Sequence, residues 1–222
     1  MKLPTIALLL SSSSTLVVVS SETVPANPQE CIDPADFPED TDYFPDKYTP
    51  HSTTDFLTID YFNTYKIVTN KFNDKSYLLY QCGTEPPESE SGKHHVVLPV
   101  PHEGGVAITQ TTQIAPMELL NKRSDIKAYI GNPQLVSSPC LNHLIDEETV
   151  DVMFNAENPY DSEFNKQSAL DFVTANPDAV VFAGPTGNKD EDSHLAIAAS
   201  QEKTAVASFD WVRIYHNVSY DY

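Results

Sequence analysis

The chain has 222 residues, and its 32 acidic side chains against 13 basic ones give a formal net charge of -19 at pH 7. That charge argues against binding to nucleic acid, because a protein needs Lys and Arg to replace the counterions of the phosphates. It also argues against binding to an anionic membrane surface. A chain of about 200 residues is long enough for one large domain or for one and a half small ones.

Residues 1–21 are predicted to be a cleaved secretory signal peptide. A single Lys at position 2 precedes an apolar, Ser-rich core, and small residues follow around Ser20 and Ser21. The serines at 11–14 interrupt the apolar run, which favours a signal peptide over a membrane anchor. We therefore expect the protein outside the cytoplasm, in a periplasm or at a cell surface.

Three cysteines in a secreted chain predict one disulfide and one remaining thiol. We prefer the pair Cys31 and Cys82, because both flank an early strand-rich segment. Cys140 lies among later strands and helices, and we expect it to be a buried free thiol. Asn217 opens a glycosylation sequon, which has meaning only in a host that glycosylates.

The first half of the mature chain changes character near residue 56. Residues 22–55 are rich in Pro, Asp and Tyr and show neither a helical nor a strand period, so they are predicted to form an extended arm. In 56–100 the odd positions from Leu57 to Ile67 are apolar or aromatic, which indicates antiparallel strands with one buried face and a hairpin partner at 76–82. The acidic segment 85–95 is predicted to be a solvated loop.

From about residue 96 short apolar runs alternate with helical patterns, and 101–200 is predicted to form a binding lobe. Alternation of this kind predicts an α/β fold with a mainly parallel sheet flanked by helices, here after an antiparallel β-hairpin extension. Trp211, in the final predicted helix, is expected in the core. The expected strands are 96–100, 106–109, 126–130, 179–183 and 194–199, and the expected helices lie near Met117, at 141–145, at 164–174 and from Phe209.

Three sets of residues could carry a site. Binding sites in parallel sheets lie beyond the carboxyl ends of the strands, which selects the polar run with Thr111, Thr112 and Gln113, although helix capping would also explain it. A second loop resembles a phosphate loop only loosely, because no GK[ST] ending follows, and a tight turn is the alternative. Its residues are Gly184, Pro185 and Thr186.

The third set is a group of histidines, His94, His95 and His102. Neutral imidazoles bind transition metals, but this spacing matches no established zinc or copper pattern, so a surface loop is the alternative. The sequence has no GxSxG elbow and no HExxH motif. We therefore expect no catalytic residues and no enzyme.

Several segments, in order, resemble the class III periplasmic substrate-binding proteins, the family that binds iron-siderophore complexes and cobalamin. The resemblance covers about residues 42–215. The matching segments are DYFPDKY (42–48), YQCGTEPP (80–87), VVLPVP (96–101), VAITQTTQIAPMELL (106–120), DIKAYIG (125–131), NPDAVVF (176–182) and EKTAVASFDW (202–211).

The resemblance implies two α/β lobes joined by a long rigid helix, with the ligand held between them by loops at strand ends. By position it implicates Thr111 to Gln113, Ser137, Ser138 and Gly184 to Thr186. Residues 201–222 would begin the connecting helix, with the second lobe missing. The resemblance implies a metal chelate as ligand, no cofactor and no enzymatic activity.

Two further expectations concern partners. In the family a glutamate docks onto an ABC permease, and this chain has Leu170 at that position, which argues against docking to a standard permease. We expect a monomer. The alternatives are a secreted interaction or structural module that kept the fold without ligand uptake, and a transition-metal binder acting through the histidine loop.

Overall fold

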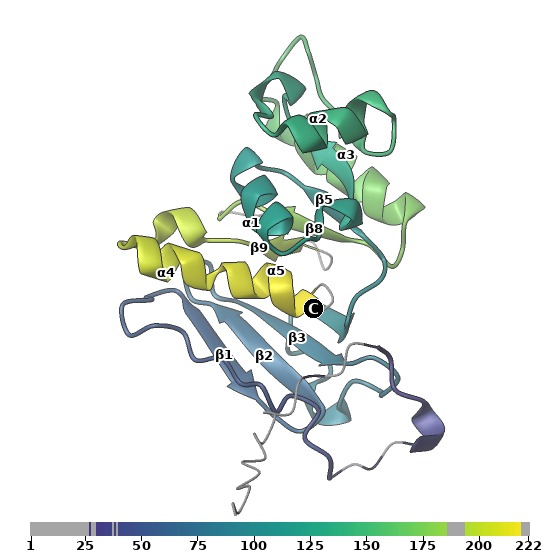
Figure 1. Ribbon diagram of the computed structural model, residues 1–222, viewed down its shortest axis with the longest axis vertical. Coiled ribbons are helices and arrows are strands. Elements are labelled where there is room, and N and C mark those ends of the chain that lie inside the picture. Colours follow the sequence, from purple (N-terminus) through teal and green to yellow (C-terminus); the bar gives the residue numbers. More distant parts are fainter. Residues whose placement is uncertain (1–26, 28–29, 37, 39, 186–193, 219–222) are drawn as a thin grey trace, which may run out of the picture.

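The computed structural model describes residues 27, 30–36, 38, 40–185 and 194–218, with two β-sheets and five α-helices in this part of the chain (Figure 1). Sheet A has the order β1-β2-β3-β4. Its strands are β1 (Leu57–Tyr61), β2 (Tyr65–Asn70), β3 (Lys75–Gln81) and β4 (Val96–Val100). The first three run antiparallel, and β4 joins β3 in parallel.

Sheet B is parallel throughout and has the order β7-β6-β5-β8-β9. The predicted α/β fold with a mainly parallel sheet is therefore confirmed. The strands are β5 (Val106–Ile108), β6 (Ile126–Ile130), β7 (Asp151–Met153), β8 (Val180–Ala183) and β9 (His194–Ala196). The sequence did not predict β7, because its three residues carry no periodic signal and only one is a β-branched residue.

The α-helices are α1 (Ile114–Leu119), α2 (Pro139–Asp146), α3 (Ser162–Ala175), α4 (Ala205–Asp210) and α5 (Val212–Val218). Two short 3-10 helices matter for the site, η3 (Thr111–Gln113) before α1 and η6 (Ala199–Gln201) before α4. No helix in the described residues is both long enough and apolar enough to cross a membrane.

The register of sheet A corrects the predicted buried face of its second strand. The prediction placed Ile67 on the buried face together with the odd positions of β1. Tyr61 pairs with Lys66, however, so odd positions in β1 share a face with even positions in β2. As a result β2 buries Lys66, Val68 and Asn70 instead. The sequence period is correct, but the paired Tyr61 and Lys66 are separated by an even number of residues (62–65), so odd positions face even ones, which only the pairing reveals.

Helices cover both faces of sheet B. On one face α3 packs against β6 and β8, where Phe172 and Ala169 meet Ile130 and Val181. On the other face α1 and α5 belong to a larger core that also takes in the buried face of sheet A. Figure 1 shows α4 and α5 lying between the two sheets.

The C-terminal helices are part of the core. Trp211, Ile214 and Val218 are each 0% exposed, which confirms the core position predicted for Trp211. The Tyr215 ring meets Phe182 of β8 edge-on, with ring centroids 4.9 Å apart. The helix expected from Phe209 starts earlier, at Ala205, and is interrupted at Trp211.

The cysteines follow the prediction in part. Cys31 and Cys82 form a disulfide with Cα atoms 4.5 Å apart, as predicted, and this bond fits an extracytoplasmic location. Cys140 is exposed, so the prediction of a buried thiol was wrong. It lies in the first turn of α2, where the adjacent Leu141 takes the inward position. The predicted signal peptide and Ser219 of the sequon lie outside the described residues.

Candidate functional site

The carboxyl edge of sheet B collects several of the predicted polar loops. Because its five strands are parallel, the segments after β5, β6, β8 and β9 all leave the sheet at the same edge. Such an edge is the usual place for ligands in α/β proteins. The loops that the sequence prediction selected therefore share one edge of the sheet, and the structure shows which of them line a common pocket.

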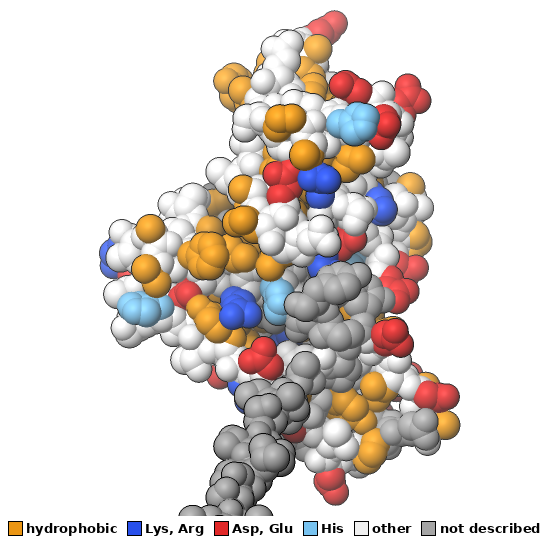
Figure 2. Space-filling view, in the orientation of Figure 1, with side chains coloured by type: hydrophobic (Ala, Val, Ile, Leu, Met, Phe, Trp, Pro, Cys, Tyr) orange, Lys and Arg blue, Asp and Glu red, His pale blue; other side chains and the backbone are white. Residues whose placement is uncertain are grey.

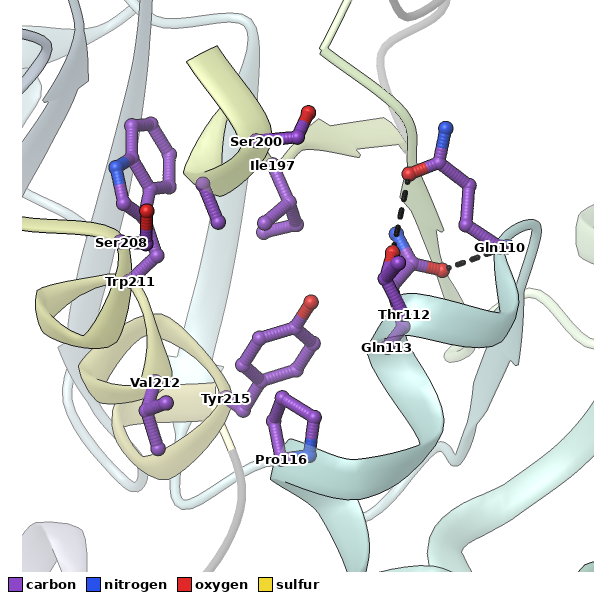
Figure 3. Close-up of a pocket in the computed structure, with 11 residues that line it drawn as sticks. Gln110, Thr112, Gln113, Pro116, Ile197, Ser200, Ser208, Trp211, Val212 and Tyr215 are labelled. Atoms are coloured by element: carbon purple, nitrogen blue, oxygen red, sulfur yellow. Dashed lines mark hydrogen bonds between the residues drawn. The ribbon is translucent and has the colours of Figure 1, made fainter. Parts of the chain in front are cut away.

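A pocket of about 180 Å³ lies at this edge, between η3 and the C-terminal helices (Figure 3). Four segments contribute to it: the loop and helix after β5, the segment after β9, α4 and α5. None of the lining side chains is a carboxylate, a lysine, an arginine or a histidine. The lining residues are Gln110, Thr112, Gln113, Pro116, Ile197, Ala199, Ser200, Ser208, Trp211, Val212 and Tyr215.

Gln113 holds the edge of the sheet together. Its Oε1 accepts hydrogen bonds from the amides of Thr109 (2.9 Å) and Gln110 (3.1 Å), and its Nε2 donates to the carbonyl of Ala183 (3.1 Å). The side chain is 1% exposed. Gln113 was predicted as a ligand contact, but its amide already joins the ends of β5 and β8, so it shapes the pocket wall.

The neighbouring residues of this loop differ in their access to the pocket. Thr112 is exposed and lines it, with its Oγ1 donating to Gln110 Oε1 at 3.4 Å. Thr111 is the first residue of η3 and does not line the pocket. Of the three predicted positions, the structure brings Thr112 and Gln113 to the pocket.

Ser137 and Ser138 lie away from the pocket. Ser138 caps α2 by accepting from the amide of Leu141 at 3.1 Å, and its hydroxyl donates to Glu118 of α1. Ser137 is exposed. The segment after β6 leaves toward α2 (Figure 1), and neither serine is among the residues that line the pocket.

The loop after β8 approaches the pocket indirectly. A Cβ on Gly184 would lie 2.3 Å from Nε2 of Gln110, so glycine at this position leaves room for a pocket residue. The carbonyl of Pro185 accepts from Asn73 Nδ2 at 3.4 Å, which directs this end of the loop toward sheet A. Thr186 lies outside the described residues.

Two aromatic residues of the C-terminal helices form the apolar side of the pocket. Trp211 is fixed by its indole Nε1, which donates to Glu202 Oε1 at 3.0 Å. Glu202 in turn accepts from the amides of Asp55 (2.9 Å), at the end of the N-terminal arm, and of Phe56 (3.1 Å), which follows it. Tyr215 is 2% exposed, and Figure 3 shows its hydroxyl pointing into the pocket.

The sequence did not identify the contributions of Ile197, Ser200, Ser208, Val212 and Tyr215. No local signal marks them, because the C-terminal helices reach the edge of sheet B only through their packing on Phe182 and α1. The one available clue was the helical spacing of Trp211 and Tyr215, which places both on one helix face.

The three candidate histidines do not form one group. His94 and His95 precede β4, and His102 follows it, so the strand separates them by about 17 Å. Both ring nitrogens of His94 have neighbours, Ser76 Oγ at 2.9 Å and Glu90 Oε2 at 3.1 Å. Across the described residues, no set of three or more His, Cys, Asp or Glu side chains is arranged to hold a metal ion.

Large hydrophobic side chains are exposed on α1 and α4, the helices that contribute Pro116 and Ser208 to the pocket. Figure 2 shows hydrophobic side chains gathered where α4 and α1 lie near each other in Figure 1. The exposed large residues in these helices are Leu119 (73%), Phe209 (64%) and Val206 (53%). The edge is therefore apolar at its surface and uncharged within the pocket.

Comparisons of the chain with models of known protein families, with curated proteins and with solved structures find no match.

Proposed function

We propose that this protein is an extracytoplasmic solute-binding protein for a metal chelate, of the iron-siderophore or cobalamin kind. The observation that carries the proposal is the pocket at the carboxyl edge of the parallel sheet, lined by aromatic, aliphatic and uncharged polar side chains. Pockets for small organic ligands have this composition, with few polar groups among apolar ones.

The charge of the protein and the uncharged lining of the pocket indicate which kind of chelate would bind. A net charge of -19 repels anionic ligands at a distance, and no basic side chain lines the pocket to offset that repulsion. A neutral chelate therefore suits this protein better than a highly anionic one. The pocket volume of about 180 Å³ accommodates one ring-sized part of such a molecule, and the remainder would lie against the exposed apolar side chains of α1 and α4.

The test is a calorimetric titration of the purified protein. The three ligands are a neutral ferric hydroxamate, an anionic ferric catecholate and cobalamin. We expect saturable binding of at least one, with the neutral chelate favoured over the anionic one. Ser200→Phe, which places a ring at the pocket, should abolish binding. Ser137→Phe is the matched control, because Ser137 is exposed and lies outside the pocket. A flat response to all three compounds would overturn the proposal.

An interaction module is the second candidate, favoured by the exposed Val206 and Phe209 on α4. If the protein binds another protein, Phe209→Ser should remove association with that partner. Chelate titrations should then be flat for the variant and for the unmodified protein alike. Chelate binding that depends on Ser200 would argue against this candidate.

A further inference from the structure

The hydroxyl of Tyr215 differs from every other polar group around the pocket. The side chains of Thr112, Gln113, Ser208 and Trp211 each make a hydrogen bond within the protein. The same is true of Gln110, as an acceptor from Thr112, and of Ser200, which accepts from Gln201 at 3.2 Å. Tyr215 is 2% exposed, and its hydroxyl makes no hydrogen bond to any residue that the structure describes.

The surroundings of this hydroxyl are apolar on one side and open on the other. The Tyr215 ring is fixed by its edge-on contact with Phe182, so it cannot turn away without losing core packing. Figure 3 shows the hydroxyl pointing toward the space between Ile197 and Thr112. Among the described residues, this hydroxyl does not belong to the fully enclosed side-chain atoms that lack a hydrogen bond. The Tyr215 hydroxyl is instead open to the pocket, from which a ligand oxygen can bond to it.

We propose that the Tyr215 hydroxyl is the anchoring hydrogen-bond group for an uncharged, ring-sized ligand group that carries a hydroxyl or carbonyl oxygen. This inference rests on the pocket of the proposed function, but it does not depend on the ligand being a metal chelate.

Size and charge together define the ligand group. Apolar cavities of about 150 Å³ hold a benzene ring, and this pocket measures about 180 Å³. The space therefore fits one six-membered ring with a small substituent. A carboxylate or ammonium group would lose its hydration here without an opposite charge in the lining, which excludes charged groups.

Burial also keeps the tyrosine in its neutral form. It raises the pKa of Tyr215 well above its ordinary value. At neutral pH the group is therefore a phenol that can both donate and accept, which suits either a carbonyl or a hydroxyl oxygen on the ligand.

The single tryptophan offers a direct measurement, because the chain contains one Trp and it forms part of the pocket wall. In a ¹⁵N-labelled sample the Trp211 indole N–H gives one resonance. We would titrate the intact protein with phenol, toluene and benzoate and follow that resonance. Phenol is expected to shift it saturably and to bind about five- to tenfold more tightly than toluene, as one hydrogen bond allows. Benzoate is expected to leave the Trp211 resonance unshifted.

Two variants test the assignment. Tyr215→Phe should lower the affinity for phenol to that for toluene, without changing toluene binding. Tyr129→Phe is the control, because that hydroxyl donates to the carbonyl of Asn132 outside the pocket, and it should leave phenol affinity unchanged. If Tyr215→Phe does not fold, the ratio of phenol to toluene affinity in the unmodified protein still decides the question.

The inference is overturned if neither phenol nor toluene shifts the resonance, if the two bind equally well to the unmodified protein, or if benzoate binds best. These outcomes are distinct from failure of the proposed function. Phenol binding together with flat chelate titrations would support the role of Tyr215 and overturn the proposal that the ligand is a metal chelate. Chelate binding without phenol binding would support the chelate and overturn the role of Tyr215.

Discussion

Tyr48 and Asp210 lie 162 residues apart in the sequence and are joined by a hydrogen bond from the Tyr48 hydroxyl to the Asp210 carboxylate. Asp210 is 3% exposed and also accepts from the hydroxyl of Thr54 and from the amide of His51, the latter at 2.7 Å. The N-terminal arm is thereby attached to α4. Since α4 leads directly into the pocket residue Trp211, the position of this pocket wall depends on the arm.

Asp210→Asn should destabilise the protein by about 1–3 kcal/mol, because the new amide nitrogen cannot accept the hydrogen bonds made to a buried carboxylate. Burial by itself would raise the pKa of Asp210, but the hydrogen bonds from Thr54, Tyr48 and the His51 amide outweigh it and hold that pKa below its usual range. The stability from this group is therefore present above about pH 4 and is lost as the pH falls further. Urea unfolding at pH 7 measures the loss.

The control for this prediction is Asp42→Asn. Asp42 lies in the same arm, but its contact with Lys47 is exposed, with side chains 37% and 47% accessible. An exposed ion pair contributes less than about 1 kcal/mol. Equal effects from the two substitutions would show that the Asp210 cluster has no special role.

His194 should make the protein less stable in mild acid. Burial, with a smaller contribution from the nearby Lys75 charge, lowers the pKa of His194 from 6.5 to about 4. The unfolded chain binds a proton at this residue as the pH falls below about 6.5, whereas the folded protein does not until about pH 4. Stability is therefore complete above pH 6.5 and declines below it, by roughly 2–3 kcal/mol over this window.

The measurement is the free energy of unfolding at several pH values between 7 and 4, for the unmodified protein and for His194→Gln. The variant should show a smaller decline in this window. An identical slope in both proteins would assign the decline to other groups, among them His102, whose pKa burial also lowers.

Two glycines should respond differently to alanine. A Cβ on Gly104 would lie 1.7 Å from the carbonyl oxygen of Asp178, which is backbone and cannot move without shifting the start of β8. A Cβ on Gly184 would meet only the end of the Gln110 side chain, which can rotate. We expect Gly104→Ala to cost about 1–3 kcal/mol or more in stability, and Gly184→Ala to cost much less.

Thermal unfolding of the two variants, compared with the unmodified protein, measures this difference. Gly184→Ala should nevertheless weaken ligand or phenol binding, because Gln110 lines the pocket. A large loss of stability in Gly184→Ala, or none in Gly104→Ala, would contradict the contacts described above.

The three cysteines should differ in their reactivity toward a maleimide. Cys140 is exposed and should react with a maleimide in the native protein, whereas Cys31 and Cys82 should react only after reduction.

The disulfide closes a loop with a sequence separation of 51 residues, so replacing both of its cysteines by alanine should lower the free energy of unfolding by about 2–4 kcal/mol. Mass spectrometry of labelled protein and thermal unfolding of the variant measure the two effects.

Much of the fold could be predicted from local patterns. The bounds of β4 and β6 agree with the apolar runs, and the helix expected at 164–174 lies within α3. The disulfide pair was also predicted from its position around the strand-rich segment. For the strands and the helix a local sequence preference and the final structure agree, so no distant contact was needed to decide the outcome.

The site required the tertiary structure. From the sequence alone, the alternation of strands and helices predicted a parallel sheet and therefore the edge at which ligands usually bind in such folds. It could not show that Gln113 is used to join β5 to β8, that Ser138 caps a helix, or that Tyr215 reaches the same edge from the C-terminus. Hydrogen-bond partners and pocket walls come from residues far apart in the chain, and only packing between the two sheets brings them together.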